Sequence, residues 1–181
     1  THADATRYET PIAGIGPRAT PTVLSNRVYT LGATGRLNCL ELETGKPVWS
    51  RDLAADGGAK MPGWGFAGSP LVLEDTVIVS SGGPGKSLIA YRAGTGEIAW
   101  AAGESGTSYA SPFAATLARI PHLLMFNGGR VTGHDARSGA VLWEKSWGVG
   151  NPHVAMPVVT GPDTVVISAG YGAGAEMFRV V

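Results

Sequence analysis

The chain has 181 residues, of which 44% are hydrophobic and 15% are charged, and its 14 Lys and Arg residues balance 14 Asp and Glu residues. This composition excludes a disordered tail, and the balanced charge argues against nucleic acid or an anionic membrane as a partner. The single cysteine, Cys39, excludes an intrachain disulfide, and no apolar run in the sequence reaches membrane-spanning length.

Short strands separated by turns follow one another along the chain, and the sequence predicts no long amphipathic helix. The clearest stretch runs from Leu40 to Trp49 and predicts a strand, a tight turn at Thr44-Gly45 and a second strand. The same pattern returns at 90–100 and 133–143, always with Thr or Ser five residues before a Trp and Gly four residues before it. A glycine at that point is typical of a hairpin whose tip needs a left-handed residue.

The recurring residues are expected to have a structural role. A Trp on the outer strand of each repeat can bury about 150–250 Å² against the next repeat, which cannot cover its own face. We therefore predict turn and docking roles for Thr44, Gly45, Trp49, Thr95, Gly96, Trp100, Ser138, Gly139 and Trp143. Tyr8 stands 13 residues before Pro21, as Trp100 stands 12 before Pro112, so Tyr8 is expected to fill the Trp position of an earlier repeat.

A small residue or Met followed by Pro marks the start of each repeat, at Thr20-Pro21, Ser69-Pro70, Ser111-Pro112 and Met156-Pro157. The prolines lie 49, 42 and 45 residues apart, a period typical of propellers and solenoids. Short strands in every repeat, without a long helix, favour an all-β propeller of four-stranded antiparallel blades. The repeats are expected at about 19–52, 67–103, 109–146 and 154–181 within a single domain of residues 1–181.

The fourth repeat stops before its own Thr-Gly turn and Trp, so the chain holds about four blades' worth of a propeller. We expect a partial ring whose remaining blades belong to a longer protein. The alternative is that a strand around 5–11 closes the last blade instead of belonging to a preceding one. Leu53 to Gly65 is expected to be an insertion in a connecting loop, where function often resides.

The pattern Ala-x-Asp-x-x-Thr-Gly-x-x-x-Trp resembles the tryptophan-docking repeat of pyrroloquinoline-quinone (PQQ)-type propellers, and the resemblance extends from about Tyr8 onward. Thr or Ser, Gly and Trp match in all three copies. The Ala position holds Cys39, Ala90 and Gly133, and only Asp135 keeps the acid as Asp. WD-type propellers need a Trp-Asp pair that is absent, and kelch repeats have a shorter spacing between turn and Trp.

The resemblance implies two functional classes. One is the quinoprotein dehydrogenases, which bind PQQ and calcium in a central funnel. The other is the non-enzymatic propellers, such as the lipoprotein scaffold of the outer-membrane β-barrel assembly machinery. Many dehydrogenases of the first class carry adjacent cysteines, whereas this chain has Cys39 alone, and its acids stand mostly at turns. We therefore predict no catalytic residue, no metal site and no cofactor, and keep PQQ and calcium for the alternative.

Other chemistries find less support in the sequence. The four histidines have no zinc-type spacing; they are His2, His122, His134 and His153. Ser80 to Ser87 ends in Gly-Lys-Ser but lacks the spacing of a phosphate-binding loop and is not followed by a helix, so a hairpin loop is expected there.

Segments just before each small-residue-Pro pair should lead into the innermost strands near the propeller axis. They carry bulky or polar side chains beside glycines, and the candidate binding residues are Arg18, Trp64, Phe66, Tyr109 and His153. The alternative is that Trp64 and Tyr109 plug the channel and that Arg18 is a solvated charge.

The predicted function is a non-catalytic, extracytoplasmic propeller, periplasmic by resemblance, that acts as a binding or scaffold module with a protein or peptide partner. A small ligand is possible, and nucleic acid is not expected. The alternative is part of a PQQ- and calcium-dependent dehydrogenase that oxidises alcohols or sugars.

Overall fold

The computed structural model describes residues 1–5, 7–12, 14–148 and 152–181, and nearly all of their regular secondary structure is β-strand. The first three large sheets each contain four strands. The first consists of β3 (Thr22–Leu24), β4 (Arg27–Leu31), β5 (Arg36–Glu41) and β6 (Pro47–Asp52). The second consists of β7 (Leu71–Leu73), β8 (Thr76–Gly83), β9 (Lys86–Arg92) and β10 (Ile98–Ala102). The third consists of β11 (Phe113–Leu117), β12 (Ile120–Asn127), β13 (Arg130–Asp135) and β14 (Val141–Ser146).

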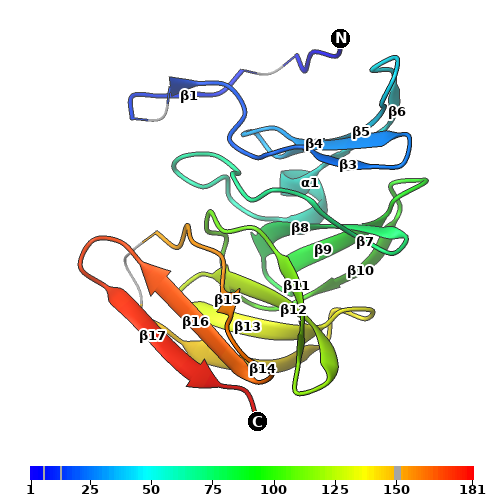
Figure 1. Cartoon of the computed structure of the whole chain (residues 1–181). Coiled ribbons are helices and arrows are strands. Elements are labelled where there is room, and N and C mark those ends of the chain that lie inside the picture. Colours follow the sequence, from blue (N-terminus) through cyan, green and yellow to red (C-terminus); the bar gives the residue numbers. More distant parts are fainter. Residues whose placement is uncertain (6, 13, 149–151) are drawn as a thin grey trace.

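The fourth large sheet has three strands among the described residues, namely β15 (Val158–Val159), β16 (Thr164–Ala169) and β17 (Gly174–Arg179). In all four sheets, strands that follow one another in the chain pair antiparallel, and the sheets lie one after another along an arc (Figure 1). Each sheet is a propeller blade, and the arc is open. The chain therefore forms a partial ring of an all-β propeller, as its repeats predict.

The hairpin between the third and fourth strands of a blade has the same geometry in all three complete blades. Gly45, Gly96 and Gly139 have φ angles of +69°, +74° and +74°, which glycine adopts without steric cost. Each glycine N–H donates to a carbonyl four residues earlier, at 2.8–2.9 Å. In the third blade, Ser138 also donates to the carboxylate of Asp135, which lowers the pKa of that carboxyl group. The recurring Thr/Ser-Gly pair is thus explained by the turn.

The Trp side chains lie against the turn of the following blade. A Cβ atom at Gly96 would lie 2.7 Å from Cδ2 of Trp49, and one at Gly139 would lie 2.3 Å from Cε3 of Trp100. The register shifts by one residue just before each Trp, so Trp49 pairs with Cys39 and Trp100 pairs with Ala90. This bulge turns the indole toward the next blade.

The blade after Trp143 has no hairpin between a third and a fourth strand among the described residues. Trp143 lies over Gly133 of its own blade, where a Cβ atom would come within 2.2 Å of the indole. It also makes an edge contact with Phe178 of β17, with ring centroids 5.8 Å apart. The lack of a side chain at Gly133 therefore leaves room for the indole of Trp143.

The core lies between the blades. Val77 and Val79 of β8 face the first blade and pack with Tyr29 and Leu37, whereas Ile78 of the same strand faces the third blade. Both faces of the second blade are therefore buried, which explains why its strands do not alternate between apolar and polar residues.

The N-terminal segment does not have the arrangement that the repeat predicts. Residues 9–10 (β1, Glu9–Thr10) pair only with β2 (Gly14–Ile15), in a small hairpin of their own. Tyr8 lies beside Gly65, and the residue next to the Gly45 turn is Thr1. Thr6 of the expected strand 5–11 lies outside the described residues.

The predicted insertion begins with a short helix, α1 (Leu53–Gly57), which Asp52 caps by accepting hydrogen bonds from the N–H groups of Ala54 and Ala55. Leu53 is fully buried. A Cβ atom at Gly57 would lie 1.7 Å from Oγ of Ser81, so the helix is in close contact with the second blade. The insertion is thus a wedge between the first two blades.

The contact between Trp49 and Gly96 can be tested against a matched turn. Gly96→Ala and Gly45→Ala both place alanine at a positive φ angle, but only the former directs a Cβ atom into an indole. Overpacking costs about 1–3 kcal/mol, so Gly96→Ala should lower the free energy of unfolding by about that much more than Gly45→Ala. Urea unfolding followed by Trp fluorescence measures the difference. Equal losses would show that the indole contact contributes nothing.

Candidate functional site

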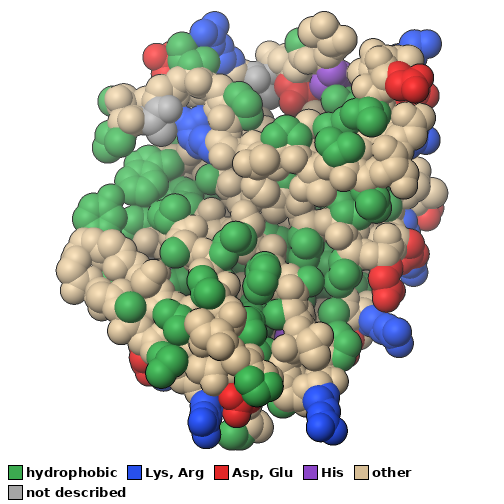
Figure 2. All heavy atoms as spheres, viewed as in Figure 1, with side chains coloured by type: hydrophobic (Ala, Val, Ile, Leu, Met, Phe, Trp, Pro, Cys, Tyr) green, Lys and Arg blue, Asp and Glu red, His purple; other side chains and the backbone are tan. Residues whose placement is uncertain are grey.

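The loops that connect the outer strand of one blade to the inner strand of the next lie together at one end of the blades; we call this end the connecting-loop face. It lies at the left margin of Figures 1 and 2, where the surface is mostly apolar or uncharged. Many of the charged side chains in this view lie instead at the right margin, near the opposite hairpins.

Arg18 is held within its own loop. Its guanidinium group donates to the carbonyls of Gly16 (2.5 Å) and Gly14 (3.0 Å) and lies 5.1 Å from the ring centre of Tyr8. The Tyr8 hydroxyl donates to the carbonyl of Gly63 at 2.8 Å. Arg18 and Tyr8 therefore lie next to the loop that carries Trp64.

Trp64 and Tyr109 form the next contact along this face. Their ring centroids are 4.9 Å apart, and both side chains are half-buried. They come from the connecting loops of successive blades, 45 residues apart in the sequence. The rings therefore form an aromatic pair that keeps part of its surface exposed to solvent.

His153 lies beneath the neighbouring loop and is only 3% exposed. Its ring stacks on Phe126 with centroids 4.3 Å apart, and its Nδ1 accepts a hydrogen bond from the N–H of Gly129 at 3.3 Å. Its carbonyl accepts hydrogen bonds from Ser108 Oγ and from the N–H of Tyr109. Four of the five predicted residues therefore lie along one row of contacts, the axial row, formed by Arg18, Tyr8, Trp64, Tyr109 and His153. Asn151, in the segment before His153, lies outside the described residues.

Phe66 is the exception among the predicted residues. It is 1% exposed and packs with Leu53 in the core between the first two blades. A Cβ atom at Gly35 would lie 2.9 Å from its ring. Phe66 therefore fills the core beside the wedge and is not part of the axial row.

An ion-pair network that the sequence reasoning missed joins the wedge to both blades. Asp56 of α1 accepts two hydrogen bonds from Arg51 of β6, at 2.8 and 2.9 Å, and one from the hydroxyl of Tyr91 of β9, at 2.9 Å. Lys86 donates to the backbone carbonyl of Asp56. Burial, together with the Asp56 carboxylate, raises the pKa of Tyr91, which stays protonated. Only spatial proximity joins these residues, so no sequence motif could reveal them.

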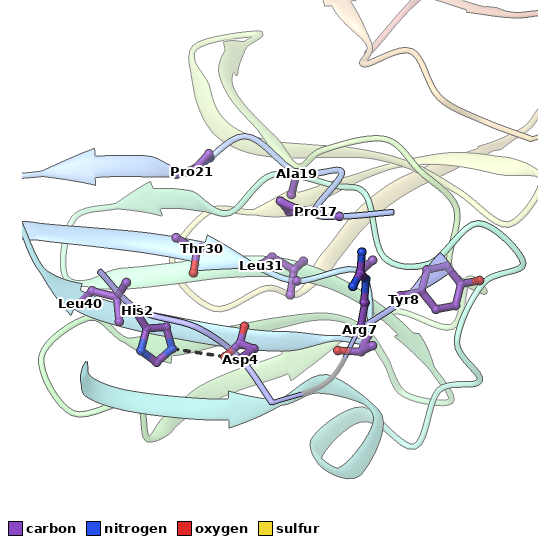
Figure 3. A pocket seen from close by; sticks show the side chains of 14 residues that line it. His2, Asp4, Arg7, Tyr8, Pro17, Ala19, Pro21, Thr30, Leu31 and Leu40 are labelled. Atoms are coloured by element: carbon purple, nitrogen blue, oxygen red, sulfur yellow. Dashed lines mark hydrogen bonds and ion pairs between the residues drawn. The ribbon is translucent and has the colours of Figure 1, made fainter. Parts of the chain in front are cut away.

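A cavity of about 400 Å³ lies between the N-terminal segment and β4–β5 of the first blade (Figure 3). His2 and Asp4 lie on one side, linked by a 3.2 Å hydrogen bond, and Leu31 and Leu40 lie near them. Asp4 also accepts from the side-chain amide of Asn38, so this segment is held to the blade. Of the axial row, only Tyr8 lines this cavity.

Among the described residues, no group of three or more His, Cys, Asp or Glu side chains is placed to hold a metal ion. Cys39 is buried below Trp49, and burial raises the pKa of its thiol, so it is not a reactive thiolate. Within these residues no helix is both long and apolar enough to cross a membrane.

The Asp56 network should contribute to stability. Asp56→Ala removes three hydrogen bonds and leaves the buried Tyr91 hydroxyl without its partner, which should cost about 2–3 kcal/mol. The control is Asp75→Ala, which breaks an ion pair with Arg92 whose two side chains are 69% and 51% exposed and should cost less than about 1 kcal/mol. Urea unfolding of both variants gives the comparison, and similar losses would contradict a structural role for the network.

Two buried histidines should make stability depend on pH. Burial lowers the pKa of both His134 and His153 below the ordinary value of 6.5. At a pH between the lowered pKa of each histidine and 6.5, the unfolded chain binds more protons than the folded chain. The free energy of unfolding should therefore fall as the pH drops from about 7 to about 5. Urea midpoints across this range test the prediction. In a His134→Gln/His153→Gln double variant, stability should depend less on pH. An unchanged dependence would show that other groups cause it.

Comparison with known proteins agrees with this architecture. The sequence pattern of the family described as "Outer membrane protein assembly factor BamB" matches residues 5–179. A curated protein of that name from Aliivibrio fischeri is 46% identical over 37 residues, which cover 20% of this chain and 10% of the relative.

Two solved structures share the fold. BamB from Moraxella catarrhalis superposes with a TM-score of 0.63 at 22% identity, covering 90% of this chain and 47% of that one. A quinohemoprotein alcohol dehydrogenase from Pseudomonas putida superposes with a TM-score of 0.61 at 17% identity, covering 82% of this chain and 31% of that one. The chain thus spans less than half the length of these relatives. Because the family pattern covers nearly every residue, the chain belongs to the family of the outer membrane protein assembly factor BamB.

Proposed function

We propose that this chain is a non-catalytic binding module that takes part in outer-membrane protein assembly outside the cytoplasm. Its family membership supports this role and location, because the family and the relative from Aliivibrio fischeri are both described as outer membrane protein assembly factors. The observation that carries a binding role is the axial row, in which the half-buried rings of Trp64 and Tyr109, from two connecting loops, pack side by side.

The axial row suits an extended peptide. Aromatic side chains with two rotatable bonds lose little entropy on binding and offer large apolar contact surfaces. Trp64 and Tyr109 pack on each other, so the pair is already ordered before a partner arrives. Arg18 is fixed by the carbonyls of its own loop, which makes it a brace for Tyr8 instead of a free charge. Apolar residues of an unfolded chain would therefore pack on the exposed rims of the rings.

His153 has a supporting part in this proposal. It is buried, and its carbonyl fixes the backbone of Tyr109 while its ring packs on Phe126. A partner would contact Trp64 and Tyr109, whose positions His153 helps to set. In the part of the chain that the structure describes, no group of three or more His, Cys, Asp or Glu side chains is placed to hold the calcium ion that the dehydrogenase alternative needs.

The proposal can be tested with a fluorescently labelled, urea-unfolded outer-membrane β-barrel protein diluted into a solution of the chain. Trp64→Ala and Tyr109→Ala should each weaken binding about tenfold, since truncation of an aromatic anchor at an interface commonly costs more than about 1 kcal/mol. Fluorescence anisotropy measures the affinity. Arg119→Ala is the control, because this exposed residue lies in the β11–β12 hairpin at the opposite end of its blade.

Two results would contradict the proposal. One is unchanged affinity in both aromatic variants while their circular dichroism shows a folded protein. The other is quinone absorbance with dye-linked alcohol oxidation after PQQ and calcium are added, because that activity belongs to the dehydrogenase alternative.

A further inference from the structure

A strained hairpin in the fourth blade exposes an aromatic side chain at the connecting-loop face. The hairpin joins β16 to β17 and lies at the left margin of Figure 1 with the connecting loops. At its tip the N–H of Ala173 donates to the carbonyl of Gly170 at 3.2 Å. The two residues between them, Tyr171 and Gly172, both have positive φ angles, of +59° and +79°. This is the pattern of a type I′ turn, whose first central residue is usually Asn, Asp or Gly.

Tyrosine is an unfavourable residue at this place in the turn. A bulky residue with a positive φ angle is rare, because its Cβ atom crowds the following carbonyl oxygen. In the corresponding hairpins of the first three blades, the described residues with positive φ angles are all glycines, namely Gly35, Gly85, Gly128 and Gly129. The other described non-glycine residues with positive φ angles lie in hairpins at the opposite end of the blades, and none of them is aromatic.

The packing of Tyr171 does not offset this strain. The residue is 76% exposed, and it makes no hydrogen bond or ring contact with the other residues that the structure describes. Strained backbone conformations cluster at sites that bind ligands. An exposed aromatic ring also offers a partner a large contact surface with only two rotatable bonds. Strain and exposure together therefore indicate a ring that is kept for an external contact.

The hairpin lies at the same end of the blades as the axial row. The carbonyl of His153 accepts the N–H of Tyr109, and the chain leads from His153 into β15, the inner strand of the fourth blade. β15 pairs with β16 and β16 pairs with β17, so the row ends at the blade that carries Tyr171. The turn before β16 lies at the opposite end, where the N–H of Ala118 donates to the carbonyl of Pro162 at 2.7 Å. The hairpin after β16 therefore continues the axial row.

The separation between Trp64 and Tyr171 sets a minimum length for a partner that contacts both. Trp64 stands in the loop that leads into the second blade, and Tyr171 stands in the fourth blade. Packed sheets lie about 10 Å apart, so the two rings lie on the order of 20 Å apart. An extended chain covers about 3.3 Å per residue, and its side chains alternate between two faces. A segment that contacts both rings therefore has about six residues or more, with apolar side chains at alternate positions.

We propose that Tyr171 is a second anchor for the partner of the axial row, and that this partner is an extended segment of about six residues or more with alternating apolar side chains. This inference rests on the proposed function and adds the length and the pattern of the segment. One end of the segment packs on Trp64 and Tyr109, and the other end packs on Tyr171. The strained turn holds the Tyr171 ring away from its own blade, where the segment reaches it.

The variant Tyr171→Asn separates binding from folding. Asparagine suits the left-handed conformation of this turn, so the variant should unfold at the same urea concentration as the wild type or at a higher one. The probes are two fluorescein-labelled peptides of alternating leucine and serine, four and ten residues long, or about 13 and 33 Å when extended. In fluorescence anisotropy, Tyr171→Asn should weaken binding of the ten-residue peptide about three- to tenfold and leave binding of the four-residue peptide unchanged.

Two further variants separate this inference from the proposed function. Tyr171→Phe keeps the ring and should bind both peptides as the wild type does, whereas Trp64→Ala should weaken binding of both. If the wild type binds neither peptide, the proposed function and this inference fail together. If Trp64→Ala weakens binding but Tyr171→Asn leaves the affinity for the ten-residue peptide unchanged, or weakens both peptides equally, this inference alone is overturned.

Discussion

The contact between a tryptophan and the turn glycine of the next blade is the interaction on which this structure depends. A sheet with two apolar faces cannot bury either of them alone, so each blade needs a neighbour on both sides. Trp49 and Trp100 extend this burial to the outer strands. Glycine at positions 96 and 139 leaves space for the two indoles and also adopts the positive φ angle of the turn. The arrangement of blades then fixes which loops meet at the connecting-loop face.

Much of this could be predicted from the sequence, because the interaction recurs. Thr44, Gly45 and Trp49 stand in the same order as their counterparts in two further repeats, and that order identified the hairpin, the blade and the propeller. The repeat also has a small residue opposite each Trp, at Cys39, Ala90 and Gly133. The structure explains the glycine at 133, because the indole of Trp143 lies over it. The bulge that turns each Trp outward could not be predicted, since no residue type marks it.

The candidate site was predictable only in part, because it is made of the segments that do not repeat. The sequence predicts four residues of the row because they stand just before the inner strands, namely Arg18, Trp64, Tyr109 and His153. In the structure, this position in each repeat brings them into one row of contacts. Their accessibility was not predictable: Phe66 and His153 are buried because the wedge and the neighbouring loop close over them. The Asp56 network depends on contacts between blades, which local sequence does not encode.

The central claim, that a Trp holds each blade to the next, predicts that damage at one junction stays local. Amide hydrogen exchange of Trp49→Ala tests this most directly. Strands β4 and β5 of the first blade should lose protection about 5- to 30-fold, as expected for a loss of 1–2 kcal/mol, while β12 and β13 of the third blade keep theirs. Equal loss of protection in all blades, or no loss in the first, would contradict the account.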